Sequence, residues 1–249
     1  NLYLQTKQLS HFLTKKNLNH QPVLLLYQNT IDFIIAFLAC LDSGIIAIPT
    51  CPIHMNKNTD RLKTIIQDSN AKAILTTEKV HNLALSRTES LTEILDIPII
   101  KSDLTITKQH YKNPNKKHFN SIAFLQYTSG STSDPKGVMV THLNILYNCK
   151  VIKRKMNITK NSRILSWLPN FHDMGLIGGY LPCIYSGSTT ILMDASTFIQ
   201  NPIKWLQSIT KYKASHSGGP NFSYNLCCEK ITTAQKETLD LNSWICAFN

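Results

Sequence analysis

LLLYQNTIDFIIAFLACLDSGIIAIPTCP, which runs from Leu24 to Pro52, contains two short apolar runs on either side of a longer one. The first run starts one residue before this stretch, at Val23, ends at Tyr27 and predicts a strand. Thr30 can cap the helix that follows, and Gly44 can close it. The second run, Ile45 to Ile48, predicts another strand, so this stretch has the strand–helix–strand order of a βαβ unit.

The same alternation continues toward the C-terminus. Pro49 and Pro52 are expected to end the extended segment. A second helix is predicted at about Asp60 to Ser69 and a further strand at Ala71 to Thr76. Repeated βαβ units predict an α/β fold with layered, mostly parallel sheets and covering helices.

The rest of the chain repeats the pattern after a polar interval. Asp103 to Asn120 has no apolar period and is expected to connect two subdomains, residues 1–120 and 121–249. Strands are predicted at Ser121–Tyr127, Lys136–Val140, Ile164–Leu168 and Thr189–Met193. Helices are predicted from Thr141 to about Met156, around Met174 to Tyr185, and from Asn201-Pro202 onward.

The composition is that of a globular protein, with 43% hydrophobic and 16% charged residues among 249. The most apolar stretch, Phe33 to Leu41, is far shorter than the roughly 20 residues that cross a bilayer. We therefore expect a buried core helix and no membrane span. No secretory signal is visible at the start of the sequence.

Seven cysteines, an odd number without CxxC spacing, indicate neither a disulfide framework nor a zinc site. Reduced thiols in a cytoplasmic protein are the simplest interpretation. The net charge of +11 would suit a polyanion. The lysines are scattered, however, and lack the interleaved aromatics that stack bases, so we expect no nucleic-acid partner.

The strongest functional signal is YTSGSTSDPKGV, Tyr127 to Val138, a loop rich in hydroxyls and glycine between two predicted strands. Hydroxyl groups can donate to phosphate oxygens, Gly130 lets the backbone approach them, and Lys136 supplies positive charge. The expected ATP and phosphate ligands are Thr128, Ser129, Gly130, Ser131, Thr132, Ser133, Lys136 and Gly137.

This loop is not a Walker A element, which needs Gly-Lys-Ser/Thr at the start of a helix. Here Pro135-Lys136-Gly137 leads into a strand-like run, so P-loop ATPase and kinase interpretations lose support. The remaining alternative is a ligand-free hairpin loop. The fixed order of SGST followed by PKG argues against that alternative.

The longer string FLQYTSGSTSDPKGVMVTH, Phe124 to His142, resembles the phosphate-binding signature of the adenylate-forming superfamily. It is most similar to the fatty acyl-AMP ligase branch of that superfamily. Ser133 departs from the glycine of many superfamily members, but serine is familiar in this branch. The resemblance covers nearly all of this chain but less than half of a typical member.

A second motif, WLPNFHDMGLIGG from Trp167 to Gly179, resembles the family segment that leads from a strand into the helix of the acyl pocket. His172 and Asp173 could instead form a catalytic dyad. No nucleophile motif such as GxSxG accompanies them, and adjacent residues are expected to point in different directions. An isolated histidine would otherwise be a structural residue at a helix start.

A third motif, SHSGGPNFSYNLC from Ser215 to Cys227, resembles the family strand and turn that line the acyl tunnel. Gly218 and Gly219 are expected to leave room for a substrate chain, and Pro220 to stiffen the entry to a helix. The resemblance implies an acyl and adenylate pocket formed by His172, Asp173, Met174, Gly175, Ser217, Gly218, Gly219 and Pro220.

The resemblance implies that a fatty acid attacks ATP to form an acyl-adenylate and pyrophosphate, with Lys136 and His172 as catalytic residues. Mg²⁺ would be held by the phosphates with help from Thr132. The acyl group would pass to an acyl carrier protein. Two alternatives stay open: a fatty acid–CoA ligase, and a non-catalytic remnant that binds phosphate or acyl ligands. Because the sequence stops at DLNSWICAFN, ahead of the family's later catalytic elements, we expect the 249-residue chain to be inactive alone.

Overall fold

The computed structural model describes residues 1–52, 59–86, 96–104, 119–128 and 135–249. Its contacts divide the chain into two compact units, Asn1–Asn144 and Ile145–Asn249. Each unit is built on its own sheet with helices, so the predicted α/β class with mostly parallel sheets is confirmed.

The first unit contains a six-stranded sheet in the order β4-β3-β1-β2-β5-β6. All neighbouring strands are parallel except β5 and β6, which form an antiparallel pair. The strands are β1 (Pro22–Leu26), β2 (Ile46–Thr50), β3 (Ala73–Thr76), β4 (Ile99–Lys101), β5 (Ile122–Thr128) and β6 (Lys136–Thr141).

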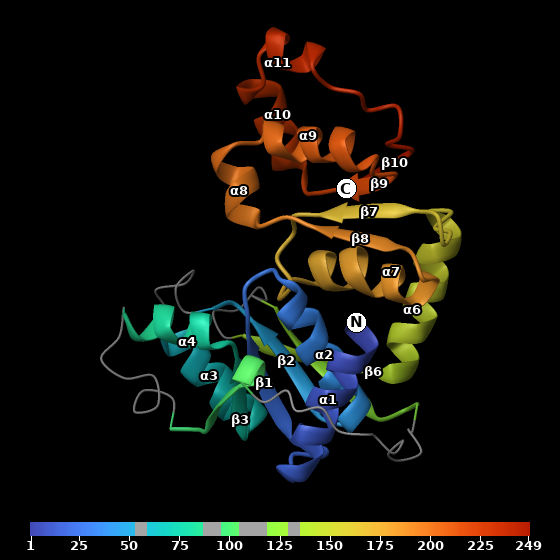
Figure 1. Cartoon of the computed structure of the whole chain (residues 1–249). Coiled ribbons are helices and arrows are strands. Elements are labelled where there is room, and N and C mark those ends of the chain that lie inside the picture. The colour runs from blue at the N-terminus through green and yellow to red at the C-terminus, as the bar shows by residue number, and fades with distance from the viewer. Residues whose placement is uncertain (53–58, 87–95, 105–118, 129–134) are drawn as a thin grey trace. The chain divides into compact units, whose positions relative to one another are not determined.

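The helices of the first unit cover both faces of this sheet. They are α1 (Leu2–Lys15), α2 (Ile31–Ser43), α3 (Thr59–Ser69), α4 (Glu78–Leu85) and the short 3₁₀ helix η1 (Ser102–Leu104). The chain reverses its direction along the sheet after β2, and parallel crossovers are right-handed, so α2 lies on one face and α3 and α4 on the other (Figure 1).

The expected boundary at residue 120 differs from the boundary between the compact units, which follows Asn144. The reason is strand pairing: Phe124 of β5 is the parallel partner of Ala47 of β2, and β6 extends the same sheet. Most of the polar stretch expected to join the subdomains, residues 105–118, lies outside the described residues.

Helix α2 is the buried core helix that its apolar run predicts. Phe33 and Phe37 stack with their ring centroids 5.8 Å apart, and Phe37 meets Phe124 of β5 edge-on at 5.5 Å. Gly44 ends the helix with a left-handed backbone, φ 75°, which suits glycine. Thr30 occupies the N-cap position, but its side chain makes no capping hydrogen bond.

The second unit contains a four-stranded parallel sheet in the order β10-β9-β7-β8. Its strands are β7 (Arg163–Ser166), β8 (Thr189–Leu192), β9 (His216–Gly218) and β10 (Cys246–Phe248). Helix α6 (His142–Lys155) precedes the sheet, and Thr141 caps it as predicted: Asn144 N donates to Thr141 Oγ1 at 3.1 Å.

Further helices connect the strands of the second unit. They are the π-helix η2 (Met174–Tyr180), α7 (Leu181–Ser186), α8 (Ala195–Gln200), α9 (Ile203–Tyr212), α10 (Asn221–Lys230) and α11 (Thr233–Glu237). The helix predicted around Met174 to Tyr185 is therefore present, but its first half is a π-helix. Such segments are rare and are frequent at functional sites.

Aromatic side chains form the core of the second unit. Trp205 of α9 is fully buried and contacts the rings of Tyr224 and Trp244, with centroids 5.5 and 5.4 Å away. Trp167, directly after β7, stacks on Phe198 of α8 at 4.1 Å. This core holds the segments after β7 and β9 against each other.

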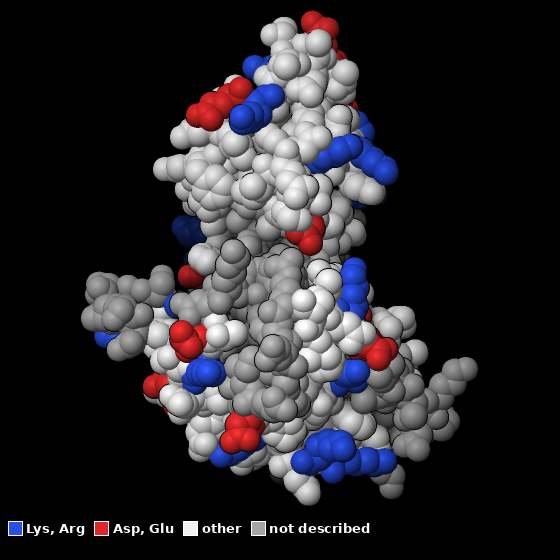
Figure 2. Space-filling view, turned by 90° about the vertical axis from the view of Figure 1, so that its left-hand side faces the viewer, with Lys and Arg blue, Asp and Glu red and all other residues white. Residues whose placement is uncertain are grey.

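Among the described residues, no helix combines the length and the apolar character that crossing a bilayer requires. All seven cysteines are free thiols. Among the described residues on the face shown in Figure 2, lysine, arginine and acidic side chains are scattered and do not form one large basic patch.

Candidate functional site

The stem of the predicted phosphate loop is the β5–β6 hairpin in the first unit. Thr128, the last residue of β5, is paired with Lys136, the first residue of β6. Both side chains are exposed. The hairpin therefore holds a hydroxyl and a cation on directly paired residues at the point where the two strands separate.

The loop tip contains five of the predicted phosphate ligands: Ser129, Gly130, Ser131, Thr132 and Ser133. These residues lie outside the described part of the chain. Their roles, including that of Thr132 toward a phosphate-bound Mg²⁺, remain predictions. Among the described residues no group of three or more His, Cys, Asp or Glu side chains could hold a metal ion.

Gly137 has a packing role in this stem. It is paired with Tyr127, and a Cβ at Gly137 would lie 2.9 Å from Cζ of the Tyr127 ring. The missing side chain therefore makes room for the aromatic ring across the hairpin. This geometry gives a structural reason for the glycine besides the phosphate contact that the sequence suggests.

His172 and Asp173 lie in the second unit, after β7. Nδ1 of His172 is 2.7 Å from Oδ1 of Asp173, and the two side chains are 64% and 57% exposed. The expectation that these neighbours point in different directions is wrong. The chain turns into η2 at this point, and the turn brings both side chains to the same backbone N–H.

That backbone group is the N–H of Met174, the first residue of η2. It donates to Asp173 Oδ1 at 2.6 Å and lies 3.3 Å from His172 Nδ1. Asp173 is thus the N-cap of the π-helix. The Met174 side chain packs against the aromatic core of the unit.

Gly175 allows η2 to pack closely on the segment before it. A Cβ at Gly175 would lie 2.1 Å from the carbonyl oxygen of Pro169. Gly179 does the same one turn later, where a Cβ would be 2.8 Å from Ser166 Oγ. The glycines of this motif therefore bring the helix onto β7 and the loop that follows it.

The third motif lies beside the second. Ser217 of β9 pairs with Leu165 of β7, so both motifs follow the carboxyl ends of neighbouring parallel strands. Ligand sites in α/β proteins are commonly formed at this edge of the sheet. The structure thus places His172, Asp173 and the Gly219–Pro220 turn at one edge of the sheet, with Ser217 in β9 itself.

Protein atoms fill the space toward which a side chain at Gly218 or Gly219 would point, so the room expected for a substrate chain does not lie in that direction. A Cβ at Gly218 would lie 2.0 Å from the carbonyl oxygen of Phe248 in β10. A Cβ at Gly219 would lie 2.5 Å from Cζ2 of Trp167. Pro220 directly precedes α10, as predicted.

Ser217 also contributes to the core. Its hydroxyl accepts a hydrogen bond from Nε1 of Trp205 and donates to the carbonyl oxygen of Leu165, both at 2.8 Å. The side chain is fully buried. Since both hydrogen bonds join core elements, this serine holds the strand edge that carries the two motifs.

Two residues at this edge that carry buried polar atoms were not among the predicted site residues. Ser166 Oγ and Trp167 Nε1 have no hydrogen-bond partner among the described residues. An unpaired buried polar group costs about 1–3 kcal/mol, so such atoms are candidates to meet a polar ligand group or a water molecule. Trp167 opens the second motif, and that position was the available signal.

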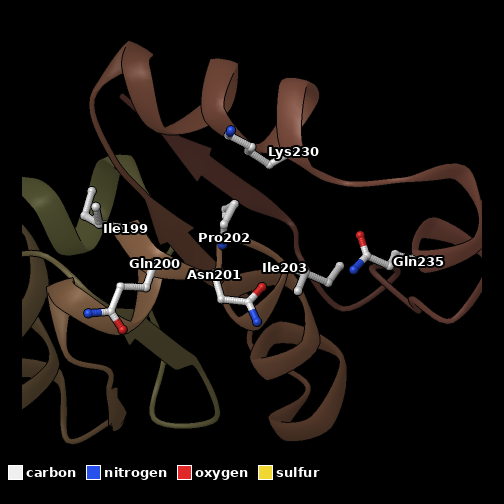
Figure 3. A pocket seen from close by; sticks show the side chains of 7 residues that line it. All are labelled: Ile199, Gln200, Asn201, Pro202, Ile203, Lys230 and Gln235. Carbon is white, nitrogen blue, oxygen red and sulfur yellow. The ribbon is translucent and has the colours of Figure 1, made fainter.

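A hollow of about 270 Å³ lies elsewhere in the second unit. Figure 3 shows its lining side chains, from the α8–α9 junction, the last residue of α10 and the middle of α11. They are Ile199, Gln200, Asn201, Pro202, Ile203, Lys230 and Gln235. None of the predicted site residues lines it.

Comparison with known proteins agrees with the motifs. The AMP-binding enzyme family model matches residues 1–247. The medium-chain fatty acid–[acyl-carrier-protein] ligase JamA of Moorena producens is 40% identical over 243 residues, which are 95% of this chain and 41% of that protein. TtuA of Teredinibacter turnerae, also named as a medium-chain fatty acid–[acyl-carrier-protein] ligase, is 34% identical over 92% of this chain and 42% of its own length.

Solved structures give the same result. The fatty acid AMP ligase of Legionella pneumophila superposes with a TM-score of 0.90 at 40% identity, over 100% of this chain and 43% of that one. A fatty acyl-adenylate ligase from the same organism, in complex with acyl adenylate and pyrophosphate, gives 0.88 at 39% identity over 100% and 43%. The chain therefore spans about two fifths of the length of these relatives.

Proposed function

Because the chain belongs to the AMP-binding enzyme family, we propose that it is the N-terminal part of the adenylating domain of a fatty acyl-AMP ligase. In the reaction, a fatty-acid carboxylate oxygen attacks the α-phosphorus of ATP. The bond to the β-phosphate oxygen breaks, and pyrophosphate leaves. Support comes from the identity to relatives named as fatty acid ligases across 92–95% of this chain.

The observation that carries this proposal is the pairing of Thr128 with Lys136 at the open end of the hairpin. Bringing a carboxylate to a polyphosphate opposes like charges. At about 4 Å they repel by about 1 kcal/mol in water and about 4 kcal/mol at the effective dielectric of a protein site. An exposed ammonium and hydroxyl on the loop stem can offset this repulsion at the phosphates.

The chemistry of this stem fits the triphosphate of ATP. Hydroxyl and ammonium groups donate hydrogen bonds to phosphate oxygens, and those to charged groups contribute about 1.5–3 kcal/mol each. A Mg²⁺ ion, when bound, would neutralise phosphate charge and stabilise the leaving pyrophosphate. Thr132 is the residue of this chain that we propose to assist it.

In the second unit, we assign His172 to the reacting carboxylate and the adenylate. Asp173 fixes the orientation of the imidazole through the 2.7 Å contact and caps η2 at the same time. Ser217 and the glycine turn hold the adjoining edge of the sheet through their hydrogen bonds and packing.

The acyl acceptor is proposed to be the phosphopantetheine thiol of an acyl carrier protein, as in the names of the two curated relatives. Coenzyme A is the alternative acceptor. Assaying the full-length protein with each thiol separates the two. A cytoplasmic location accords with the seven free thiols.

The test is pyrophosphate exchange into ATP by the full-length protein across a panel of fatty acids. Lys136→Ala is expected to lower exchange at least about 100-fold, because the transition-state charge loses a positioned cation. Lys79→Ala, which removes an exposed lysine of α4, is the matched control and should leave exchange unchanged. Absence of exchange with every fatty acid tested would refute the proposal.

The 249-residue chain alone is expected to show no fatty-acid-dependent release of pyrophosphate, since it spans about two fifths of its relatives. Release by this chain would contradict that expectation. A non-catalytic remnant is the competing function. Exchange by the full-length protein would exclude it.

A further inference from the structure

The stem of the phosphate loop is tied to a helix of the first unit by one aromatic side chain. The hydroxyl of Tyr127 donates a hydrogen bond of 2.5 Å to Oδ2 of Asp68. Tyr127 directly precedes Thr128, where the hairpin opens, and Asp68 lies in the last turn of α3. The two residues are 59 positions apart, so the contact joins distant parts of the chain.

The ring reaches Asp68 by crossing the opposite strand. Its partner across the hairpin is Gly137, and a Cβ there would lie 2.9 Å from Cζ and 3.1 Å from the hydroxyl oxygen of Tyr127. The ring is 8% exposed and packs in the core cluster that contains Leu62 and Ile65 of α3. This packing leaves the ring little freedom to turn away from the helix.

The other face of the same stem carries the phosphate-binding groups. Successive side chains of a strand point to opposite faces, so Thr128 and Lys136 point away from the face that Tyr127 occupies. Tyr127 therefore does not touch the nucleotide. Any effect that it has on the reaction acts through the position of the stem.

The donor state of Tyr127 is stable at neutral pH. Burial, followed by the hydrogen bond to Asp68 and the charge of that carboxylate, raises the pKa of the phenol. The hydroxyl thus keeps its proton, and Asp68 can serve as its acceptor.

We propose that Tyr127 and Asp68 are positioning residues that hold the stem residues Thr128 and Lys136 for ATP, and that Gly137 is glycine because the Tyr127 ring passes over it. This inference rests on the proposed adenylation function. It adds a role for a hydrogen bond on the face of the hairpin that points away from the phosphates. Losing the bond frees the β5 end of the loop, so Thr128 and Lys136 no longer hold one geometry.

The experiment measures KM for ATP and KM for the fatty acid in the full-length protein, by pyrophosphate exchange. Tyr127→Phe keeps the ring and removes the hydroxyl. Asp68→Ala removes the acceptor, and Asp68→Asn keeps an acceptor oxygen. Tyr147→Phe, at a tyrosine that is 69% exposed, is the matched control.

Tyr127→Phe and Asp68→Ala are each expected to raise KM for ATP by about 5- to 20-fold, because small displacements of binding groups are costly. KM for the fatty acid should stay unchanged. The double variant should be no worse than either single one, since both remove the same bond. Asp68→Asn should restore most of the ATP affinity, and Gly137→Ala should reproduce the defect.

Three results would overturn the inference. One is an active wild-type protein whose Tyr127→Phe variant has an unaltered KM for ATP. Another is an equal loss for both substrates, which indicates a general folding defect. The third is a wild-type protein without exchange for any fatty acid, which refutes the proposed function as well and is thereby distinguished from the first two.

Discussion

The indole of Trp167 occupies the space that a side chain on Gly219 would need. A Cβ at Gly219 would lie 2.5 Å from Cζ2 of Trp167 and 2.8 Å from Ser223 Oγ. Trp167 opens the second motif and Gly219 belongs to the third, so the two motifs pack directly on each other. The packing fixes one loop against the other at the carboxyl edge of the sheet.

This contact predicts that Gly219→Ala destabilises the protein. An extra methyl group in a packed core forces the indole or the turn to move, which costs about 1–3 kcal/mol. Urea unfolding of the chain measures the loss. Gly178→Ala is the control, because the nearest atom to its Cβ is Met174 Cγ at 4.0 Å. Equal midpoints for the two variants would contradict the prediction.

Ser217→Ala is predicted to destabilise the same edge by another route. It leaves the buried Nε1–H of Trp205 without its acceptor, at a cost of about 1–3 kcal/mol in the free energy of unfolding. In a Trp205→Phe background, Ser217→Ala should lower the free energy of unfolding by less, since no indole N–H is left unpaired. Ser196→Ala, at an exposed serine of α8, should change the free energy little.

Sequence patterns predicted the strands well because each is a short apolar run with a clear boundary. β1, β5, β6, β7 and β8 all lie within two residues of their expected ranges. Pro49 was expected to end β2, but the strand continues through it to Thr50. β2 pairs with β5 only at Ala47, so Pro49 need not donate a hydrogen bond to that neighbour.

The site was less predictable because a glycine can be required by packing against residues that are distant in the sequence. The SGGP turn predicted open space beside its glycines, whereas Phe248 and Trp167 fill the space in the direction of a side chain there. Likewise, Tyr127 is the first residue of the phosphate motif, but nothing in the sequence indicates its contact with Asp68 in α3. Local patterns mark the positions of these residues, and only the tertiary packing explains them.

The burial of each cysteine predicts how readily its thiol reacts with alkylating reagents. Burial raises the pKa of Cys183 to about 11, whereas Cys228 is exposed. At pH 8 the native chain should be alkylated at Cys228 and protected at Cys183, as mass spectrometry of iodoacetamide-treated protein can measure. Rapid labelling of Cys183 in the native chain would contradict this assignment of burial.

The same shift predicts a loss of stability at alkaline pH. The pKa of Cys183 in the folded chain is higher than the value of 9.0 for a free thiol, so its contribution is complete below about pH 9. This contribution to the free energy of unfolding is lost progressively as the pH rises toward 11. Cys183→Ala should lessen the dependence of the urea midpoint on pH between 9 and 11.

Asp173 is predicted to affect activity beyond its role as the cap of η2. Its carboxylate contacts Nδ1 of His172, but both side chains are more than half exposed, so the pair contributes less than about 1 kcal/mol to folding. In the full-length protein, Asp173→Ala should lower fatty-acid-dependent pyrophosphate exchange by about 10-fold, because the imidazole loses its fixed orientation. Asp173→Asn keeps an acceptor oxygen for the Met174 N–H and should lose less.

The chain offers a matched control in Asp194, which caps α8 by accepting a hydrogen bond of 2.8 Å from Ser196 N. Asp194→Ala removes an N-cap carboxylate without touching His172, at a cost of about 1 kcal/mol. It should lower the unfolding midpoint about as much as Asp173→Ala and leave exchange unchanged. If the two variants lose exchange equally, Asp173 acts only as a cap, and the orientation of His172 has no part in the reaction.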